Sequence, residues 1–226
     1  MRAREVDRMS HVLQGSLQSA LLNLQCLAET LAVTAIPAER ELIELIRDEL
    51  LRGSRLLVAA FDVLSLEINE VTTINLGALV RRALAAHGIR GVVVAKAAWP
   101  VAIVDPQLLS LAIAHLARNA REATSTRQRP PEITPAVRAD GGVDVIVRDW
   151  GGGLGALKSP PRAFRSTRPD HIATGLLTAE RIARLHGGTL SITSSRRGTR
   201  ARFSLSAKSF PDGARFIVRR RVRAWR

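Results

Sequence analysis

The sequence predicts an α+β fold, in which an N-terminal helical hairpin is followed by an α/β sandwich. Two observations support this. Up to about residue 66, apolar residues recur every three or four positions, which is the spacing of amphipathic helices. After Asn69, short β-branched runs alternate with helical stretches, which is typical of a sheet covered by helices. A length of 226 residues allows one domain or two small ones.

The composition is that of a globular protein with an excess of positive charge. Apolar residues make up 46% and charged residues 24%, which excludes a disordered or collagen-like chain. A single cysteine, Cys26, excludes a disulfide framework and a thiolate metal cluster, and fits a reducing cytoplasm. The net charge of +14 suggests an anionic partner.

The hairpin is expected from two long apolar periodicities separated by a break. The first helix is predicted over 6–33, residues 34–37 interrupt it, and Pro37 suits the first turn of a second helix over 38–66. Helices of this length extend roughly 42 Å at 1.5 Å per residue, and a lone pair leaves much of its apolar stripe in water. We therefore expect a homodimer in which two hairpins form a four-helix bundle.

The second region is predicted to contain seven strands and three helices. Asp105 is expected to cap the middle helix, with Pro106 in its first turn, and Gly187 and Gly188 are expected to end the last helix. The predicted strands are 71–74, 92–96, 101–104, 133–138, 143–148, 190–193 and 201–206, and the predicted helices are 76–87, 106–124 and 176–186.

Three separated segments suggest one nucleotide site. Asn119, on a predicted helix, offers an amide oxygen to hydrated Mg²⁺. Asp149 ends a strand, where a carboxylate can accept from an adenine amino group, and the glycines after it let backbone N–H groups approach phosphates. Gly175 opens a helix whose N-terminus favours a phosphate. Taken singly, each feature is weak: Asn119 is more often a solvated helix residue, a glycine run more often a loop, and Gly175 more often part of a turn.

The order of these elements adds specificity. Together they resemble the ATP-binding domain of the GHKL superfamily, specifically that of sensor histidine kinases. The matching elements occur in this order: the segment 116–123, a D-x-G-x-G run at Asp149, about twenty lid residues, Gly175-Leu176, a helix that ends in L-H-G-G, and a G-T-x-x-x-F-x-L strand. The resemblance covers about residues 70–206. It implies a Bergerat-type α/β sandwich that binds ATP and Mg²⁺.

The resemblance also implies roles for single residues. Asn119 would help to hold Mg²⁺, Asp149 would contact adenine, and Gly151, Gly153 and Gly175, which precedes Leu176, would line the phosphate path. Phe164 stands at the position of the family's F-box, and Thr199 at the threonine of the final strand pair. Arg168 has two readings, a contact to the γ-phosphate or an ordinary lid arginine.

The hairpin carries a further resemblance. Residues 11–18 and 21–25 are similar to the phosphoacceptor box of a histidine-kinase subclass, which implies that His11 accepts a phosphoryl group. A neutral imidazole nitrogen can attack phosphorus near pH 7, and the product can pass the group on. By itself, His11 also fits an exposed helix residue.

Three positions depart from the family pattern. Val12 replaces the acidic residue that often follows the phosphoacceptor, and His115 stands where the family usually has an amide or a carboxylate, four residues before Asn119. Ala173 replaces the first glycine of the G-x-G-L element. These departures bear on the rate of autophosphorylation more than on ATP binding.

The expected function is that of a two-component histidine kinase, which phosphorylates His11 from Mg-ATP and transfers the group to an aspartate of a response-regulator receiver domain. One alternative is a histidine phosphotransferase or pseudokinase that relays phosphoryl groups between receivers. Another is a nucleic-acid-binding regulator that uses the arginine-rich tail.

The domain boundaries follow from these assignments. We expect a dimerisation and phosphotransfer hairpin over 1–68, a GHKL-type ATP-binding domain over 69–207 and a basic extension over 208–226. A solvated extension is preferred to nucleic-acid binding for the tail. No membrane span or signal peptide is predicted, so we expect a cytoplasmic protein whose input comes from a separate sensor protein or from a removed N-terminal part.

Overall fold

The described residues of the chain form two compact units. The computed structural model describes residues 3–31, 36–124, 129–153 and 174–207, with residues 3–8 as backbone only. One unit holds the described residues up to Glu67, with which the part of helix α5 (Thr174–Leu185) up to Arg181 is grouped. The other unit begins at Ile68 and holds the rest. Within the described part of the chain, no helix is both long enough and apolar enough to cross a membrane.

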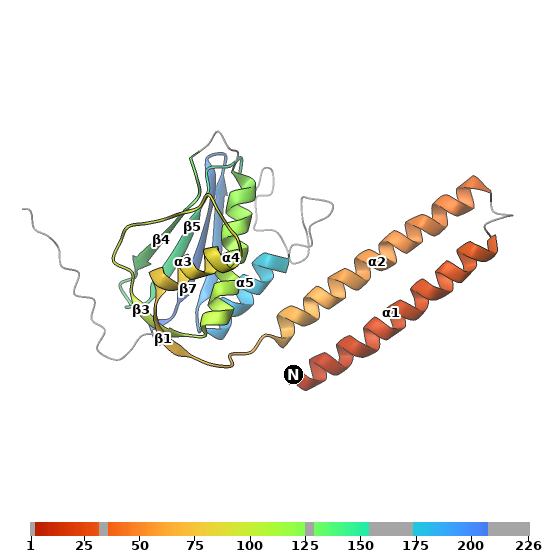
Figure 1. Cartoon of the computed structure of the whole chain (residues 1–226), viewed down its shortest axis with the longest axis horizontal. Helices are drawn as coiled ribbons and strands as arrows, with labels where there is room; N and C mark the ends of the chain where they lie inside the picture. The colour runs from red at the N-terminus through yellow and green to blue at the C-terminus, as the bar shows by residue number, and fades with distance from the viewer. Residues whose placement is uncertain (1–2, 32–35, 125–128, 154–173, 208–226) are drawn as a thin grey trace, which may run out of the picture. The chain divides into compact units, whose positions relative to one another are not determined.

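The hairpin consists of α1 (Ala3–Leu31) and α2 (Pro37–Ser65), which run side by side (Figure 1). Pro37 occupies the first turn of α2, where its missing N–H has no helical partner to lose. The Glu39 carboxylate accepts a hydrogen bond from the Ile36 N–H at 3.1 Å and so satisfies a donor at the helix start. The predicted hairpin and its break before Pro37 are confirmed.

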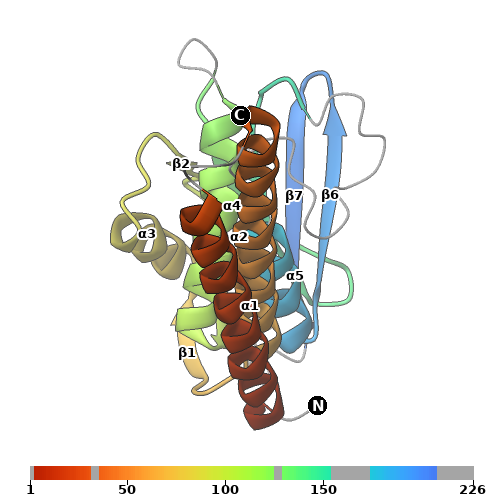
Figure 2. The same ribbon diagram turned by 90° about the vertical axis from the view of Figure 1, so that its right-hand side faces the viewer.

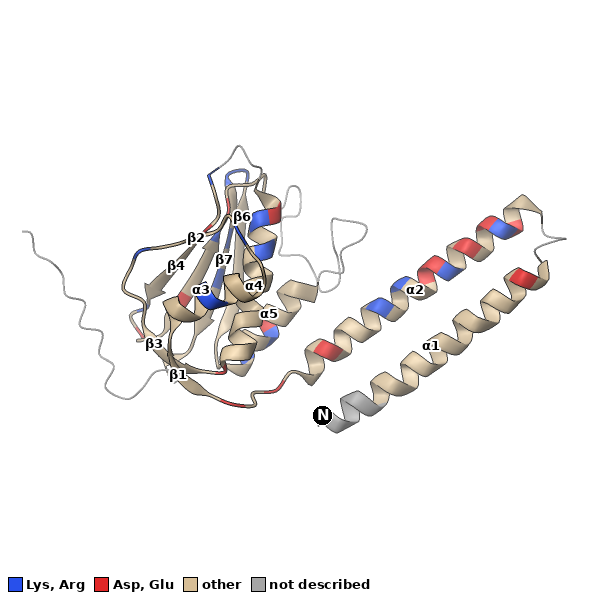
Figure 3. Ribbon diagram, in the orientation of Figure 1, with Lys and Arg blue, Asp and Glu red and all other residues tan. Residues whose placement is uncertain are grey.

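Both helices of the hairpin leave apolar side chains exposed to solvent. Among the described side chains of α1, only Glu29 is charged, whereas α2 carries both signs of charge (Figure 3). The large apolar residues that remain exposed on the two helices include Met9, Val12, Leu22, Leu27, Leu42, Leu45, Ile46 and Leu64. Pairing α1 with α2 therefore leaves much of the apolar surface of the hairpin uncovered.

The second unit contains two sheets. A two-stranded antiparallel sheet pairs β1 (Thr72–Asn75) with β3 (Val101–Val104). A five-stranded sheet has the order β2-β4-β5-β7-β6, in which only the β2–β4 pair is parallel. Figure 2 shows its two last strands, β6 and β7, side by side. The strands of this sheet are β2 (Val93–Val94), β4 (Glu132–Val137), β5 (Val143–Arg148), β6 (Thr189–Ser195) and β7 (Gly198–Leu205).

The core of this unit lies between the five-stranded sheet and helices α3 (Leu76–Ala86) and α4 (Pro106–Ala123). On β5, Val143, Val145 and Val147 are buried and share one face, because alternate residues of a strand point to the same side. α4 packs against β5 and against α3. Sheet and helices together confirm the predicted α/β sandwich.

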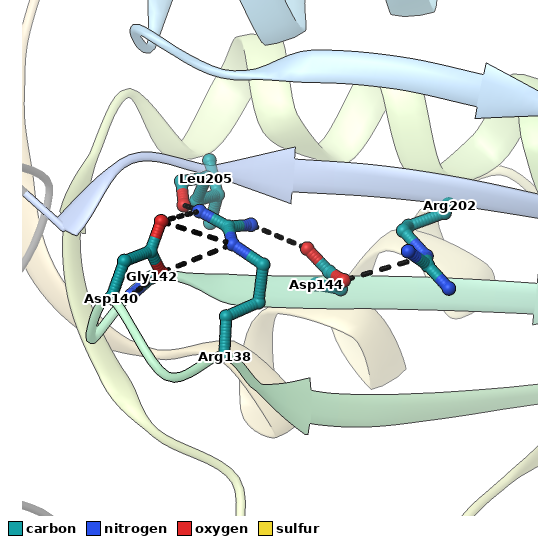
Figure 4. A network of polar contacts seen from close by, with 6 residues as sticks. All are labelled: Arg138, Asp140, Gly142, Asp144, Arg202 and Leu205. Carbon is teal, nitrogen blue, oxygen red and sulfur yellow. Dashed lines mark hydrogen bonds and ion pairs between the residues drawn. The ribbon is translucent and has the colours of Figure 1, made fainter.

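An ionic network holds the β4–β5 turn and the far end of β7 (Figure 4). The Arg138 guanidinium contacts the carboxylates of Asp140 at 3.1 Å and of buried Asp144 at 2.5 Å, and donates to the Leu205 carbonyl at 3.0 Å. Arg202 lies 3.5 Å from the other Asp144 oxygen. The buried carboxylate thus has two cationic partners, which compensate for its removal from water.

Most predicted elements are found within two or three residues of their expected ends. The Asp105 carboxylate caps α4 as predicted, accepting from the Gln107 and Leu108 N–H groups at 3.0 Å each. The strand predicted over 92–96 is shorter, because only Val93 and Val94 pair with β4. The strand predicted over 201–206 begins earlier, at Gly198, because the register with β6 starts there.

Candidate functional site

Asp149 lies directly after β5 at the end of the five-stranded sheet. Its side chain is buried, and Oδ1 accepts hydrogen bonds from the Gly151 N–H at 3.0 Å and from the Thr199 N–H at 3.1 Å. Burial raises the pKa of this carboxyl above its usual value, and the donors from Gly151 and Thr199 offset only part of that rise. The site thus contains a carboxylate with a fixed orientation and limited hydration.

Thr199 lies on the neighbouring strand β7, fifty positions after Asp149 in the chain, and hydrogen-bonds to it. The Asp149 N–H donates to the Thr199 carbonyl at 3.0 Å, so the two backbones continue the β5–β7 ladder past Arg148. The Thr199 hydroxyl lies 3.3 Å from the Ser194 hydroxyl of β6. Three strands therefore fix this end of the sheet.

The glycines after Asp149 are needed because the backbone packs closely against its surroundings. A Cβ on Gly151 would overlap the carbonyl oxygen of Ala123, the last residue of α4. Gly153 has φ +69°, and a Cβ there would overlap the carbonyl oxygen of Ser195. The turn is thus packed between the end of α4 and the end of β6, and side chains at Gly151 and Gly153 would not fit there.

Asn119 lies on α4, one turn before Ala123, and its side chain is exposed. Its amide oxygen is a ligand of the kind that Mg²⁺ binds. Within the described residues, no group of three or more histidine, cysteine, aspartate or glutamate side chains is placed to hold a metal ion. The described residues would therefore hold Mg²⁺ only if phosphate oxygens and water supply most of its ligands.

His115 lies one turn before Asn119 and is half-buried. Burial lowers its pKa below the usual histidine value, and positive charge on Arg118 and His87 lowers it further. The neutral imidazole is therefore favoured.

Other predicted residues belong to the other compact unit or lie outside the described residues. Gly175 and Leu176 lie in the first turn of α5, in the part that is grouped with the hairpin. Arg168, Phe164 and Ala173 lie outside the described residues. The structure therefore brings together Asp149, Gly151, Gly153 and Thr199 with the end of α4 that carries Asn119.

His11 lies on α1 and is exposed. Its neighbour Val12 is 66% exposed, so an apolar side chain meets solvent where the resembling family often has an acid. Ser10 and Gln14 flank His11 and hydrogen-bond to each other at 3.2 Å. The imidazole of His11 is therefore accessible from solvent.

Two features of the site have roles that were not predicted from the sequence. Gly198 has φ +112°, and a Cβ there would overlap the Asp149 carbonyl oxygen, so this glycine permits the contact between Asp149 and Thr199. In the sequence, the only indication of this role is that Gly198 directly precedes Thr199. Trp150 has Arg129 and Arg148 stacked at 4.3 and 5.0 Å from its ring centre, a contact that only the fold brings about.

Comparison with protein families identifies the domain that holds this site. Residues 104–209 match the family described as histidine kinase-, DNA gyrase B- and HSP90-like ATPases. All of Asn119, Asp149, Gly151 and Thr199 lie within that range. No curated protein matches the chain as a whole.

Solved structures support the fold. Full-length ShkA in complex with AMPPNP is 18% identical, with a TM-score of 0.57, over 91% of this chain and 46% of that one. The nucleotide-free catalytic domain of histidine kinase ThkA is also 18% identical, with a TM-score of 0.51, over 62% of this chain and 99% of that domain. The present chain thus spans about half the length of ShkA.

Proposed function

The chain contains an ATPase domain of the histidine kinase, DNA gyrase B and HSP90 type, and we propose that it is the core of a two-component histidine kinase. It would phosphorylate His11 from Mg-ATP and transfer the phosphoryl group to an aspartate of a response-regulator receiver domain. The observation that carries the proposal is the buried Asp149, held by Gly151 and Thr199 inside the ATPase domain, in a chain that also presents an exposed histidine on a helical hairpin.

The proposed nucleotide contacts use groups that the fold holds in place. The Asp149 carboxylate would accept from the adenine amino group, and its partial burial would strengthen that bond. Gly151 and Gly153 would lie along the phosphate path, as the family resemblance implies, and Gly175 and Leu176 would add donors at the start of α5. AMPPNP, bound by the similar ShkA, is a nucleotide of this class.

The charges of the triphosphate need a counter-ion. We expect the Asn119 amide oxygen to hold Mg²⁺ together with phosphate oxygens and water. When bound, Mg²⁺ would reduce the negative charge that opposes attack on the γ-phosphate. Arg168 is a further candidate for the γ-phosphate, proposed from the sequence alone.

The chemistry at His11 is a phosphoryl transfer. A neutral ring nitrogen of His11 attacks the γ-phosphorus, the bond between that phosphorus and the ADP oxygen breaks, and the imidazole releases its proton. Because the γ-phosphoryl transition state is loose, we expect the protein to contribute mainly positioning and charge stabilisation. The phosphoramidate formed can then be attacked by the aspartate of a receiver domain.

The exposed apolar residues of the hairpin support a homodimer. Val12, Leu22, Leu42 and Leu45 are all exposed in one chain, and a second hairpin would bury such residues in a four-helix bundle. The proposed protein is cytoplasmic, and a separate sensor protein is proposed as its input.

A histidine phosphotransferase or pseudokinase is the second candidate. Val12 next to His11, and the half-buried His115 one turn before Asn119, favour it, since neither supplies the side chain that the resembling family usually has at that position. Such a protein would receive its phosphoryl group from a phosphorylated receiver.

Two measurements on the full chain separate these functions. Calorimetric titration with Mg²⁺ and a non-hydrolysable ATP analogue should show saturable binding in a kinase. A chase of the phosphorylated protein with a purified receiver domain should move the label to the receiver. Absence of nucleotide binding, with labelling of His11 by a phosphorylated receiver, would favour the phosphotransferase.

A further inference from the structure

Both the backbone N–H and the carboxylate of Asp105 form hydrogen bonds to other segments of the chain. Asp105 is almost fully buried. Oδ1 accepts from the Gln107 and Leu108 N–H groups in the first turn of α4, and Oδ2 accepts at 3.1 Å from the N–H of Asn69, in the linker that follows α2. Burial raises the pKa of this carboxyl, but these backbone donors outweigh burial and lower it below its usual value. The linker and α4 thus share one carboxylate.

The same residue is tied to the end of α5. The Asp105 N–H donates to Nε2 of His186 at 3.0 Å, and Nδ1 of His186 lies 2.9 Å from the Ile182 carbonyl oxygen. A backbone N–H can only donate, so Nε2 carries no proton. The carbonyl can only accept, so Nδ1 carries one. The contacts therefore specify the neutral tautomer of buried His186 with hydrogen on Nδ1.

This junction lies at one end of two helices whose other ends carry proposed nucleotide residues. Asn119 follows Asp105 by fourteen positions on α4, and Gly175 precedes His186 by eleven positions on α5. At 1.5 Å per residue the span on α4 is about 21 Å, so a tilt of about 5° at the junction would move the Asn119 end of that helix by roughly 2 Å. Displacements of about 1 Å are enough to impair catalysis.

We infer that His186 is a positioning residue, which holds the C-terminal end of α5 against the start of α4 and the linker by accepting the Asp105 N–H. It touches no proposed nucleotide group directly. The inference deepens the proposed nucleotide site and rests on that proposal for its effect on binding. The hydrogen bond itself and its effect on α5 are independent of the nucleotide.

The test compares two substitutions in the full chain. His186→Gln places an amide oxygen near the position of Nε2 and keeps an acceptor for Asp105, whereas His186→Leu keeps apolar bulk and removes the acceptor. We expect His186→Leu to weaken binding of the Mg-bound ATP analogue about tenfold, which corresponds to one lost hydrogen bond, and His186→Gln to restore it to within about threefold.

A control separates positioning from loss of stability. Leu205→Ala removes a fully buried side chain at the far end of β7 and should lower the unfolding temperature without weakening nucleotide binding. Unchanged affinity in His186→Leu would overturn the inference. So would an equal loss of affinity in Leu205→Ala, because affinity would then simply follow stability.

Two further readouts do not depend on nucleotide. In the wild-type protein, ¹⁵N NMR of the imidazole should show a protonated Nδ1 and an unprotonated Nε2 for His186; a proton on Nε2 would overturn the inference, whether or not any variant folds. Amide hydrogen exchange in α5 should rise in His186→Leu and not in Leu205→Ala, and equal exchange in both would overturn it. If the wild-type chain bound no nucleotide, the proposed function would fail, and these two readouts would still decide the role of His186.

Discussion

Asp149 and Thr199 are joined by reciprocal hydrogen bonds across the sheet. The Thr199 N–H donates to the Asp149 carboxylate at 3.1 Å, and the Asp149 N–H donates to the Thr199 carbonyl at 3.0 Å. The carboxylate is therefore part of the fold as well as the proposed adenine contact. Substitutions that separate these two roles are the most informative ones.

Asp149→Asn should separate folding from nucleotide binding. The amide oxygen can still accept from the Gly151 and Thr199 N–H groups, and a buried charge is removed, so the unfolding temperature should be equal to or above that of the wild type. Binding of the Mg-bound ATP analogue should weaken by about 10- to 100-fold, the range for a hydrogen bond to a charged group. Calorimetric titration and thermal unfolding measure both. Unchanged affinity would contradict the adenine contact.

The raised pKa of Asp149 predicts opposite effects of pH on stability and on binding. Burial is the main cause of the shift, because it disfavours the ionised form of Asp149 in the folded state. The contribution of this carboxyl to the free energy of unfolding is therefore fully present below its pKa in the unfolded chain. It is lost as the pH rises through its higher pKa in the folded protein. The free energy of unfolding of the wild type, measured relative to Asp149→Asn, should therefore fall over that interval.

Nucleotide affinity should rise with pH over the same interval, because the proposed acceptor is the carboxylate. Titrations of the wild type and of Asp149→Asn at a series of pH values test this. An identical pH dependence in the two proteins would show that Asp149 is not the titrating group.

Gly151→Ala and Gly152→Ala form a matched pair. A Cβ on Gly151 would overlap the Ala123 carbonyl oxygen, whereas a Cβ on Gly152 meets nothing within 4 Å. We expect Gly151→Ala to lower the free energy of unfolding by about 1–3 kcal/mol and Gly152→Ala to change it by less than about 0.5 kcal/mol. Urea unfolding measures both variants. Equal stabilities would mean that the turn does not pack against α4 as described.

Arg138→Met should destabilise the ATPase unit by leaving Arg202 as the one cationic partner of the buried Asp144 among the described residues. Because Arg138 itself is 29% exposed and Arg202 remains 3.5 Å away, we expect a loss of about 1–3 kcal/mol, less than for a fully buried pair. Arg82→Met, on an exposed position of α3 in the same unit, is the control and should cost less than about 0.5 kcal/mol. A neutral effect of Arg138→Met would show that Asp144 does not depend on it.

Local signals predicted most of the elements. The three- and four-residue spacing predicted α1 and α2, Pro37 marked the start of the second helix, and Asp105 followed by Pro106 marked the start of α4. A short β-branched run predicted β5 with its observed bounds. In each case the physical cause lies within one turn of helix or a few residues of strand.

Features that depend on distant residues were not predicted. The run around Val93 was too short to show that it pairs in parallel with β4, and nothing local indicates that β5 lies beside β7. The contact between Asp144 and Arg202 depends on that register, and the bond between Asp105 and His186 spans 81 positions. The sequence predicted that the segments with Asp149 and Thr199 belong to the site, but the hydrogen bonds between these two residues follow only from the order of the strands in the sheet.

The central claim is that His11 receives the γ-phosphoryl group of ATP. The most direct measurement is incubation of the purified full chain with Mg²⁺ and ATP labelled on the γ-phosphate, followed by treatment of the protein with acid. We predict an acid-labile label on the wild type, its loss in His11→Gln, and its retention in His87→Gln, which alters another exposed histidine. Equal labelling of wild type and His11→Gln, or no label on the wild type, would contradict the account.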